Sequence, residues 1–202
     1  MIVRTLDEEV IRDIGHAFAY YDYGEERGIA SAFSDKDAAA LYICGYARGM
    51  LKGGFMRTTS EHGEGFIAYK LPGEKVSLSA LGPIIKGFFR AMSLREMMNL
   101  LKAHKKGGIG LEDRMKKEKK LYIFVGMVCV REEYQRQGYM RRLMEMAYAD
   151  GDRLGVPVIL ETDAMAKVDR YVHLGMELAG VRDFGEYGKL YDMIRYPAKT
   201  GK

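Results

Sequence analysis

A polar turn in the second half of the chain has the composition of an anion-binding site. The turn spans residues 134–139 and contains a single glycine, Gly138. Before it lies the apolar run 121–130, whose β-branched and aromatic residues predict a buried strand. After it, apolar residues return at the spacing of one helical face, which predicts a helix. These residues are Met140, Leu143, Met144, Ala147 and Leu154.

A strand, a glycine-containing turn and a helix in this order expose backbone N–H groups that can bind phosphate. The first turn of a helix leaves four amide donors without intrahelical acceptors, and the helix dipole places about half a positive charge there. Gly138 lets a phosphate approach the backbone because no Cβ stands in the way. Arg136, Arg141 and Arg142 add positive charge around the turn. The sequence therefore predicts a phosphate-binding site here.

Two motifs in this half of the chain resemble the GNAT superfamily of N-acyltransferases. The pattern Q-x-x-G-x-M at residues 135–140 resembles the family's acyl-CoA signature, with Met140 at a position that is usually small. The pattern Y-x-x-x-G-M at residues 171–176 resembles the family's Tyr-x-x-x-Gly-Phe element, with Met for Phe. The two motifs occur in the family's order and at about its separation. The resemblance covers about residues 120–197 and reaches the N-terminal half only through architecture.

The resemblance implies that acetyl-CoA is the acyl donor and that its pyrophosphate binds the turn. The backbone amides that match the family's signature belong to Gln135, Arg136, Gln137, Gly138, Tyr139, Met140 and Arg141. The pantetheine arm would pair with the preceding strand at Met127, Val128, Cys129 and Val130. An N–H group of this stretch would polarise the thioester carbonyl. Gly126, just upstream, would mark the bulge that splays the family's two central strands.

The resemblance also implies two catalytic residues. Tyr171 matches the family residue that protonates the departing thiolate; alternatively, it packs on the sheet and merely touches the cofactor sulfur. A base is required because an amine is mostly protonated at neutral pH, yet the strand 121–130 contains no carboxylate. Glu161, late in the next expected strand, is one candidate, and Glu61 and Glu64 are alternatives. Each of the three is also open to interpretation as a solvated or salt-bridged carboxylate.

Three further residues near the motifs are interpreted as structural. Asp163 follows the expected strand 156–162 and is predicted to cap the helix 165–174. His173 falls on another face of that helix than the candidate acid. Cys129 would be a nucleophile only with a partnered base and an accessible thiol, so its position in mid-strand favours a core residue.

The rest of the chain predicts an α/β fold with a mixed, mostly antiparallel sheet flanked by helices. Two helices are expected first, one ending near residue 23 and one over about 34–51, each opened by a capping pattern, T-x-x-E at 5–8 and S-x-x-D at 34–37. Neither repeats nor linkers are evident, so we expect a single domain over residues 1–202. The remaining expected strands are 55–59, 65–71, 177–182 and 189–195.

Residues 73–120 form an insertion where the family needs only a short connection. Apolar residues at helical spacing predict one or two helices, and a lysine-rich run follows at 116–120. One interpretation makes the insertion a lid or wall over the acceptor pocket, with methionines adapting to an apolar ligand. The other makes it an extra helix packed on the sheet or on a second subunit, and we favour this structural interpretation. The lysine run is interpreted as a solvated face rather than a contact for an acidic partner.

Composition bounds the remaining function classes. The chain has 202 residues with a formal charge of +4, which suits an anionic cofactor but does not require nucleic acid. Two distant cysteines and four dispersed histidines give no metal or disulfide spacing. No apolar run approaches the roughly 20 residues needed to span a bilayer, and the N-terminus lacks a signal-peptide core. We therefore expect a cytoplasmic protein without metal, membrane or nucleic-acid partners, although a homodimer is possible.

The sequence thus predicts an N-acetyltransferase that transfers an acetyl group from acetyl-CoA to an amine of a small molecule or peptide. The alternative is a catalytically weak or inactive acyl-CoA-binding module, suggested by Met140 and by the absence of a carboxylate on the cofactor strand. The acceptor cannot be identified from motifs. Four tyrosines are candidates for lining its cleft: Tyr20, Tyr21, Tyr23 and Tyr46.

Overall fold

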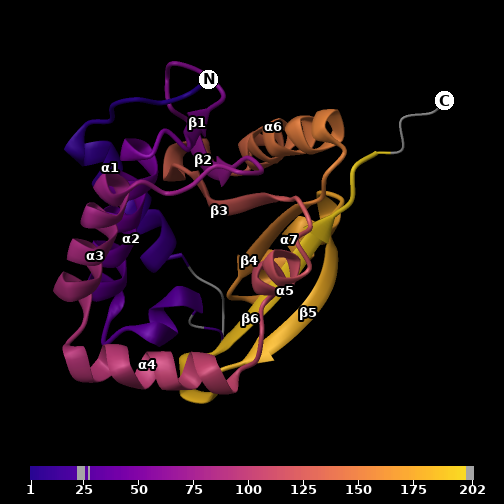
Figure 1. Ribbon diagram of the computed structural model, residues 1–202. Coiled ribbons are helices and arrows are strands. Elements are labelled where there is room, and N and C mark those ends of the chain that lie inside the picture. Colours follow the sequence, from indigo (N-terminus) through magenta and orange to yellow (C-terminus); the bar gives the residue numbers. More distant parts are fainter. Residues whose placement is uncertain (22–25, 27, 199–202) are drawn as a thin grey trace.

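The computed structural model describes residues 1–21, 26 and 28–198, so Tyr23 lies outside the described residues. Its helices are α1 (Glu8–Ala19), α2 (Lys36–Lys52), α3 (Leu78–Ala91), α4 (Leu94–Lys106), α5 (Leu111–Lys117), α6 (Tyr139–Leu154) and α7 (Met165–His173) (Figure 1). Its strands are β1 (Met56–Thr58), β2 (Gly65–Lys70), β3 (Ile123–Val130), β4 (Val158–Thr162), β5 (Glu177–Asp183) and β6 (Lys189–Arg195). Short 3₁₀ turns occur at η1 (Gly28–Ala32), η2 (Glu132–Tyr134) and η3 (Gly185–Tyr187).

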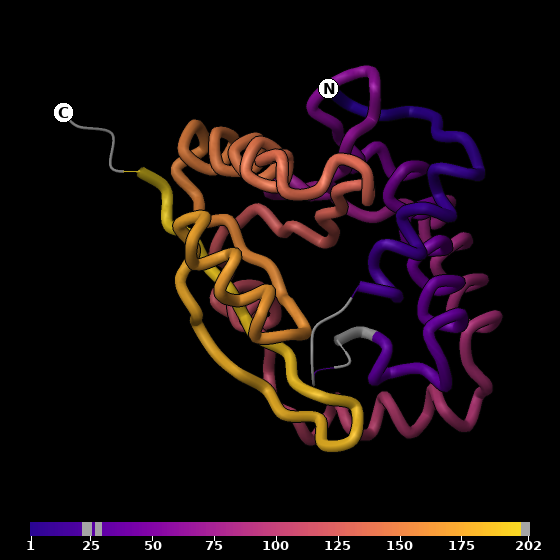
Figure 2. The backbone as a smooth tube through the Cα atoms, turned by 180° about the vertical axis from the view of Figure 1, so that it is seen from behind, coloured from indigo at the N-terminus to yellow at the C-terminus, as the bar shows by residue number. Residues whose placement is uncertain are grey.

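The strands form one six-stranded sheet in the order β1-β2-β3-β4-β6-β5. Only the central β3–β4 pair is parallel, and every other pair is antiparallel. This confirms the predicted α/β fold with a mixed, mostly antiparallel sheet. Helices α1 and α2 pack on one face of β2 and β3, and α6 packs on the other. Figure 2 shows α1 to α3 on one side of the molecule and β4 to β6 on the other.

Gly126 forms a bulge in the middle of β3, as the resemblance implied. In the register with β2, Ala68 is opposite Met127 and Tyr69 is opposite Val125, so Gly126 is the extra residue. An extra residue reverses which face the following side chains point to. Accordingly Val125 packs with α6, whereas Met127 packs with α1 and α2. The bulge redirects β3 at the point where it leaves β4.

The insertion packs partly on α2 and partly on the sheet: α3 packs on α2 through glycines, whereas α5 packs on the sheet, which the favoured interpretation allowed. A Cβ added to Gly45 would lie 2.8 Å from the Cα of Gly87, and one added to Gly49 would lie 2.7 Å from the carbonyl oxygen of Ala80. Missing side chains therefore let α2 and α3 approach closely. Helix α4 then runs across one end of the molecule toward the turn between β5 and β6 (Figure 1), where His104 contacts Phe184. Helix α5 packs beneath β4 and β6.

The predicted helix caps are wrong, although the helices are present. Helix α1 starts after Asp7 without a side-chain cap, and Glu8 pairs with Arg48 of α2 instead of closing a capping box. Helix α2 is capped by Asp35, whose side chain accepts a hydrogen bond from the N–H of Ala38, and not by Ser34. Helix α1 ends at Ala19, earlier than expected. Among the described residues, no helix is long and apolar enough to cross a membrane.

The lysine-rich run is exposed, in agreement with its interpretation as a solvated face. Lys116 pairs with Glu112 at 3.0 Å on the same helix, and Lys120 pairs with Glu118 at 2.6 Å. Both pairs lie on or just after α5, so these two lysines have carboxylate partners nearby in the sequence.

Candidate functional site

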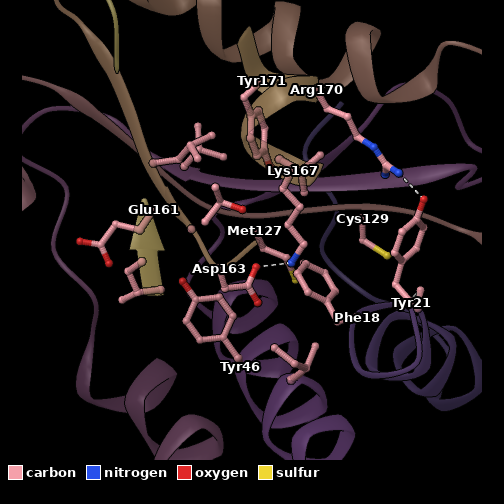
Figure 3. Close-up of a pocket in the computed structure, with 18 of the residues that line it drawn as sticks. Phe18, Tyr21, Tyr46, Met127, Cys129, Glu161, Asp163, Lys167, Arg170 and Tyr171 are labelled. Atoms are coloured by element: carbon pink, nitrogen blue, oxygen red, sulfur yellow. Dashed lines mark hydrogen bonds and ion pairs between the residues drawn. The ribbon is translucent and has the colours of Figure 1, made fainter. Parts of the chain in front are cut away.

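A cavity of about 770 Å³ lies between the open end of the β3–β4 pair and the N-terminal helices (Figure 3). One wall consists of β3, the turn that follows it, the end of β4, and α7. The opposite wall consists of side chains from α1 to α4 and from the turn between β5 and β6. Residues that range from 17 to 190 in the sequence therefore meet around one cavity.

The first wall begins where β3 and β4 part. The parallel pairing covers Ile123–Val125 on β3 and Val158–Leu160 on β4, and it stops there. Gly126 and Glu161 are the next residues on each strand, and both line the cavity. Past Gly126, the edge of β3 that faces away from β2 has no strand partner within the described residues. Its outward backbone groups are therefore available to a bound molecule.

The turn after β3 presents a second set of free backbone donors. Gly138 is the N-cap of α6 with φ of 82°, a left-handed conformation that favours glycine. A Cβ built on Gly138 would meet no atom within 4 Å, so the space in front of it is open. Among the described residues, no acceptor is assigned to the amides of Tyr139, Met140 and Arg141, the first turn of the helix. Arg136 beside them also has a positive φ, 61°.

Most of the predicted cofactor-binding residues line this cavity. They are Met127, Val128, Cys129, Val130, Gln135, Arg136, Gly138, Tyr139 and Met140. The side chains of Gln137 and Arg141 do not line it. Gln137 donates to the carbonyl oxygen of Glu133 at 3.0 Å, and Arg141 borders a separate hollow with Glu145 and Arg195. For these two residues, only the backbone amide remains as a candidate ligand group.

Cys129 has the environment of a core residue. Its side chain is 5% exposed and packs in the cluster formed with α1 and α2. Burial raises the pKa of the Cys129 thiol to about 12, so the thiol stays protonated at neutral pH. A protonated thiol is a poor nucleophile, which supports the interpretation made from the sequence.

Tyr171 and Glu161 lie on the cavity wall from different elements. Tyr171 comes from α7, is largely buried, and packs in the same core cluster as Val125 and Leu160. Glu161 comes from β4 and is labelled with Tyr171 in Figure 3. The other candidate bases lie elsewhere: neither Glu61 nor Glu64 lines the cavity. Glu64 accepts a hydrogen bond from the hydroxyl of Ser60 at 2.7 Å, which lowers its pKa.

Glu161 belongs to a buried charge cluster that the sequence did not indicate as a unit. Nη2 of Arg182 lies 2.6 Å from Oε1 of Glu161 and 2.9 Å from Oδ1 of Asp192. The side chain of Asp192 is fully buried and also accepts from the N–H of Leu111 at 3.1 Å. Burial raises the pKa of Glu161, with the Arg182 charge opposing the shift. A buried aspartate within the apolar run of β6 was the signal in the sequence that could have revealed this cluster.

Asp163 does not cap α7 as predicted. The N-cap of α7 is Ala164, without a side-chain cap. The Asp163 carboxylate instead forms an ion pair with Lys167, one turn into the helix, and the pair lies in the cavity near Phe18 (Figure 3). The i,i+4 spacing of opposite charges was the available signal.

The predicted tyrosines divide between cavity and surface. Tyr21 and Tyr46 line the cavity, and Tyr21 contacts Arg170 of α7 (Figure 3). Tyr20 instead stacks on His16 and donates to Asp37 at the surface. The hydroxyl of Tyr46 stands directly over Gly126, since a Cβ built there would lie 2.2 Å from it.

Comparison with known proteins agrees with this geometry. Residues 101–175 match the model of the acetyltransferase (GNAT) family. A solved structure of histone acetyltransferase HPA2 and related acetyltransferase from Corynebacterium glutamicum is 12% identical, with a TM-score of 0.59 over 100% of this chain and 97% of that chain. A mosquito arylalkylamine N-acetyltransferase like 5b is 14% identical, with a TM-score of 0.54 over 96% and 97%.

Other comparisons cover less of the chain or find no match. The alignment with nourseothricin acetyltransferase, at 19% identity and a TM-score of 0.36, covers 38% of this chain and about half, 51%, of that chain. Comparison with curated proteins finds no match. The family model covers the β3 strand, the glycine turn, α6 and α7, and the fold similarity covers the whole sheet. The chain therefore resembles the GNAT acetyltransferase family over residues 101–175, and its whole fold is similar to that of solved acetyltransferase structures.

Proposed function

We propose that the chain is an N-acetyltransferase that transfers an acetyl group from acetyl-CoA to the amine of a small molecule or peptide. One observation carries the proposal: the unpaired edge of β3 past Gly126 and the open amides at the start of α6 face the same cavity as Tyr171 and Glu161. A donor that is anionic at one end and extended at the other matches this pair of features.

The residues around the turn fit the phosphates of the donor. The amides of Tyr139 and Met140 supply hydrogen bonds, and the α6 dipole favours negative charge. The open space in front of Gly138 leaves room for an anion. Met127 to Val130 offer backbone groups to an extended arm, and an N–H just past the Gly126 bulge would donate to the acyl oxygen. When bound, acetyl-CoA supplies an activated thioester that a neutral amine can attack.

Proton transfer is assigned to Glu161 and Tyr171. The acceptor amine must lose a proton before it attacks, and the Glu161 carboxylate accepts it, directly or through one water. Burial raises the pKa of Glu161, which makes its carboxylate a stronger base than that of an exposed glutamate. Arg182 holds the carboxylate in position by one oxygen. The Tyr171 hydroxyl donates a proton to the departing sulfur.

Isothermal titration of the purified protein with acetyl-CoA, with ATP as a phosphate-only control, tests the donor site. Micromolar binding of acetyl-CoA alone is the expected result. Absence of binding would contradict the assignment of acetyl-CoA. A panel of amines, followed by release of free coenzyme A, then tests transfer. Binding without release for any amine would favour the alternative of an acyl-CoA-binding module.

A further inference from the structure

The half of the cavity opposite β3 is built from aromatic and apolar side chains. We call this half the acceptor chamber and define it by six lining residues: Phe33, Tyr42, Phe88, Leu100, His104 and Phe184. They come from the segment after η1, from α2, α3 and α4, and from the turn between β5 and β6. The insertion therefore supplies three of the six residues, Phe88, Leu100 and His104.

The chamber rings contact one another across these elements. The ring centroids of Phe33 and Tyr42 are 5.3 Å apart, and those of Tyr42 and Phe88 are 4.4 Å apart. On the other side of the chamber, His104 and Phe184 are 4.5 Å apart. Such contacts fix ring positions and give a preformed apolar surface.

The chamber carries no fixed charge of its own. Burial lowers the pKa of His104, so its imidazole is neutral at neutral pH. The carboxylate nearest to where the strands part is that of Glu161, on the cavity wall. A protonated amine would thus meet a carboxylate at one end and mainly aromatic and aliphatic side chains around the rest of its body. A second ammonium would be desolvated there without a carboxylate among the six chamber residues, and several hydroxyls would have only the Tyr42 hydroxyl and the His104 imidazole as partners.

Helix α4 has the character of a wall around a ligand. None of its thirteen residues, all described, is buried. Its amphipathic pattern nevertheless directs Leu100 and His104 to the cavity, while the next residue, Leu101, is 53% exposed. The helix ends are fixed by a capping box at Ser93 and Glu96 and by the contact of His104 with Phe184.

We propose that the acceptor is a small primary amine carried on an apolar, ring-sized body, and that the inserted helices α3 and α4 select it. This inference rests on the proposed acetyltransferase function and specifies its substrate class. It distinguishes such amines from polyamines, amino sugars and lysine side chains of polar peptides, whose additional polar groups the chamber does not satisfy.

The test compares matched amines at saturating acetyl-CoA by release of coenzyme A. We expect kcat/KM for 2-phenylethylamine to exceed that for ethanolamine and for spermidine by about 100-fold or more, since each buried methylene contributes roughly tenfold or more. Equal or higher kcat/KM for the polar amines would overturn the inference.

Two neighbouring variants locate the effect. Leu100→Asp places a charge in the chamber and is expected to lower kcat/KM for 2-phenylethylamine by about 30-fold, mainly through KM. Leu101→Asp, at the exposed position beside it, is expected to leave kcat/KM unchanged. The Kd for acetyl-CoA should be unchanged in both variants. Equal effects of the two substitutions would contradict a chamber on this face of α4.

Failure of the inference can be told apart from failure of the proposed function. If coenzyme A is released only with polar amines, the acetyltransferase function stands and the chamber assignment is wrong. If no amine is acetylated, the chamber assignment is tested by calorimetric binding of N-acetyl-2-phenylethylamine. Binding that Leu100→Asp removes and Leu101→Asp retains supports the chamber, and no binding at millimolar ligand overturns it.

Discussion

The two halves of the cavity are built in different ways. The half in which we propose that acetyl-CoA binds, called the donor half below, consists mainly of backbone from one continuous segment, β3 to the start of α6, with Gly126 in the bulge and Gly138 at the helix N-cap. The opposite half, which contains the acceptor chamber and is called the acceptor half below, consists of side chains from segments between α1 and the β5–β6 turn. Recognition of a common donor needs only local geometry, whereas selection of an acceptor needs a surface made by packing distant segments.

The insertion shows this difference most clearly. Its two proposed interpretations, an extra helix and a pocket wall, apply to different parts of it. Helix α3 packs on α2 at Gly45 and Gly87, which anchors the insertion. Helix α4, held by this anchor and by Phe184, lines the cavity with Leu100. The favoured structural interpretation was therefore incomplete, because the wall depends on the packing.

The largest expected effect on kcat/KM is that of replacing Glu161, which lies where the two halves of the cavity meet. Glu161→Gln should lower kcat/KM for the amine by about 100-fold or more, since it removes the proposed base. The Kd for acetyl-CoA should be unchanged. In the wild type, kcat/KM should rise with pH as Glu161 loses its proton, with a midpoint above the usual glutamate value because burial raises the pKa; the variant should lack this limb.

Glu64→Gln is the matched control for the base. Glu64 lies in the β1–β2 turn and does not line the cavity. The kcat/KM of the Glu64→Gln variant and its pH dependence should therefore equal those of the wild type. A rate loss with Glu64→Gln and none with Glu161→Gln would reassign the base.

A second prediction isolates the donor half. Gly138→Asp places a carboxylate where the pyrophosphate is expected, so the Kd for acetyl-CoA should rise by about 30-fold or more. Gly155→Asp at the other end of α6 is the control, since that glycine also has a positive φ and open space around it but is far from the cavity lining. Both Kd values are measured by titration. If the two variants have similar Kd values for acetyl-CoA, or if the Kd of Gly138→Asp stays within about threefold of the wild-type value, the phosphates do not bind at Gly138.

A third prediction concerns protonation of the leaving group. Tyr171→Phe should lower kcat by about tenfold and leave the Kd for acetyl-CoA unchanged, a modest loss because a thiol with pKa near 8.5 is already a fair leaving group. Tyr148→Phe is the control: Tyr148 lies in the same core cluster, and its buried hydroxyl has no partner among the described residues. Unchanged turnover in Tyr171→Phe would reduce Tyr171 to a packing residue.

The smallest effect on activity is expected from a substitution in the contact between α2 and α3, which supports the acceptor half. Gly45→Ala inserts a Cβ between α2 and α3, which typically costs about 1–3 kcal/mol and should lower Tm by about 3–10 °C. The displaced α3 should raise the amine KM by roughly threefold without changing donor affinity. Gly82→Ala on α3 is the control because a Cβ there meets nothing within 4 Å. A rise in donor Kd for Gly45→Ala would mean that the two halves are coupled.

Local patterns predicted the sheet well and the helix starts poorly. Every strand lies within about two residues of its expected position, because runs of apolar and β-branched residues mark buried strands directly. Caps failed because several polar residues compete near each helix start. Asp35 rather than Ser34 caps α2, and Glu8 is drawn to Arg48 from another helix. Asp163 likewise does not cap α7, because its carboxylate pairs with Lys167 four residues later.

The sequence by itself predicted the local structure of the proposed donor half, namely the strand, the turn at Gly138 and the helix after it, and the family resemblance implied the bulge at Gly126. These features depend on backbone conformation over a short segment, which neighbouring residues specify. Only the tertiary structure decided the acceptor half and the environment of Glu161. Leu100, Phe184 and Arg182 acquire their roles from packing between segments far apart in the chain, and no spacing in the sequence encodes that proximity.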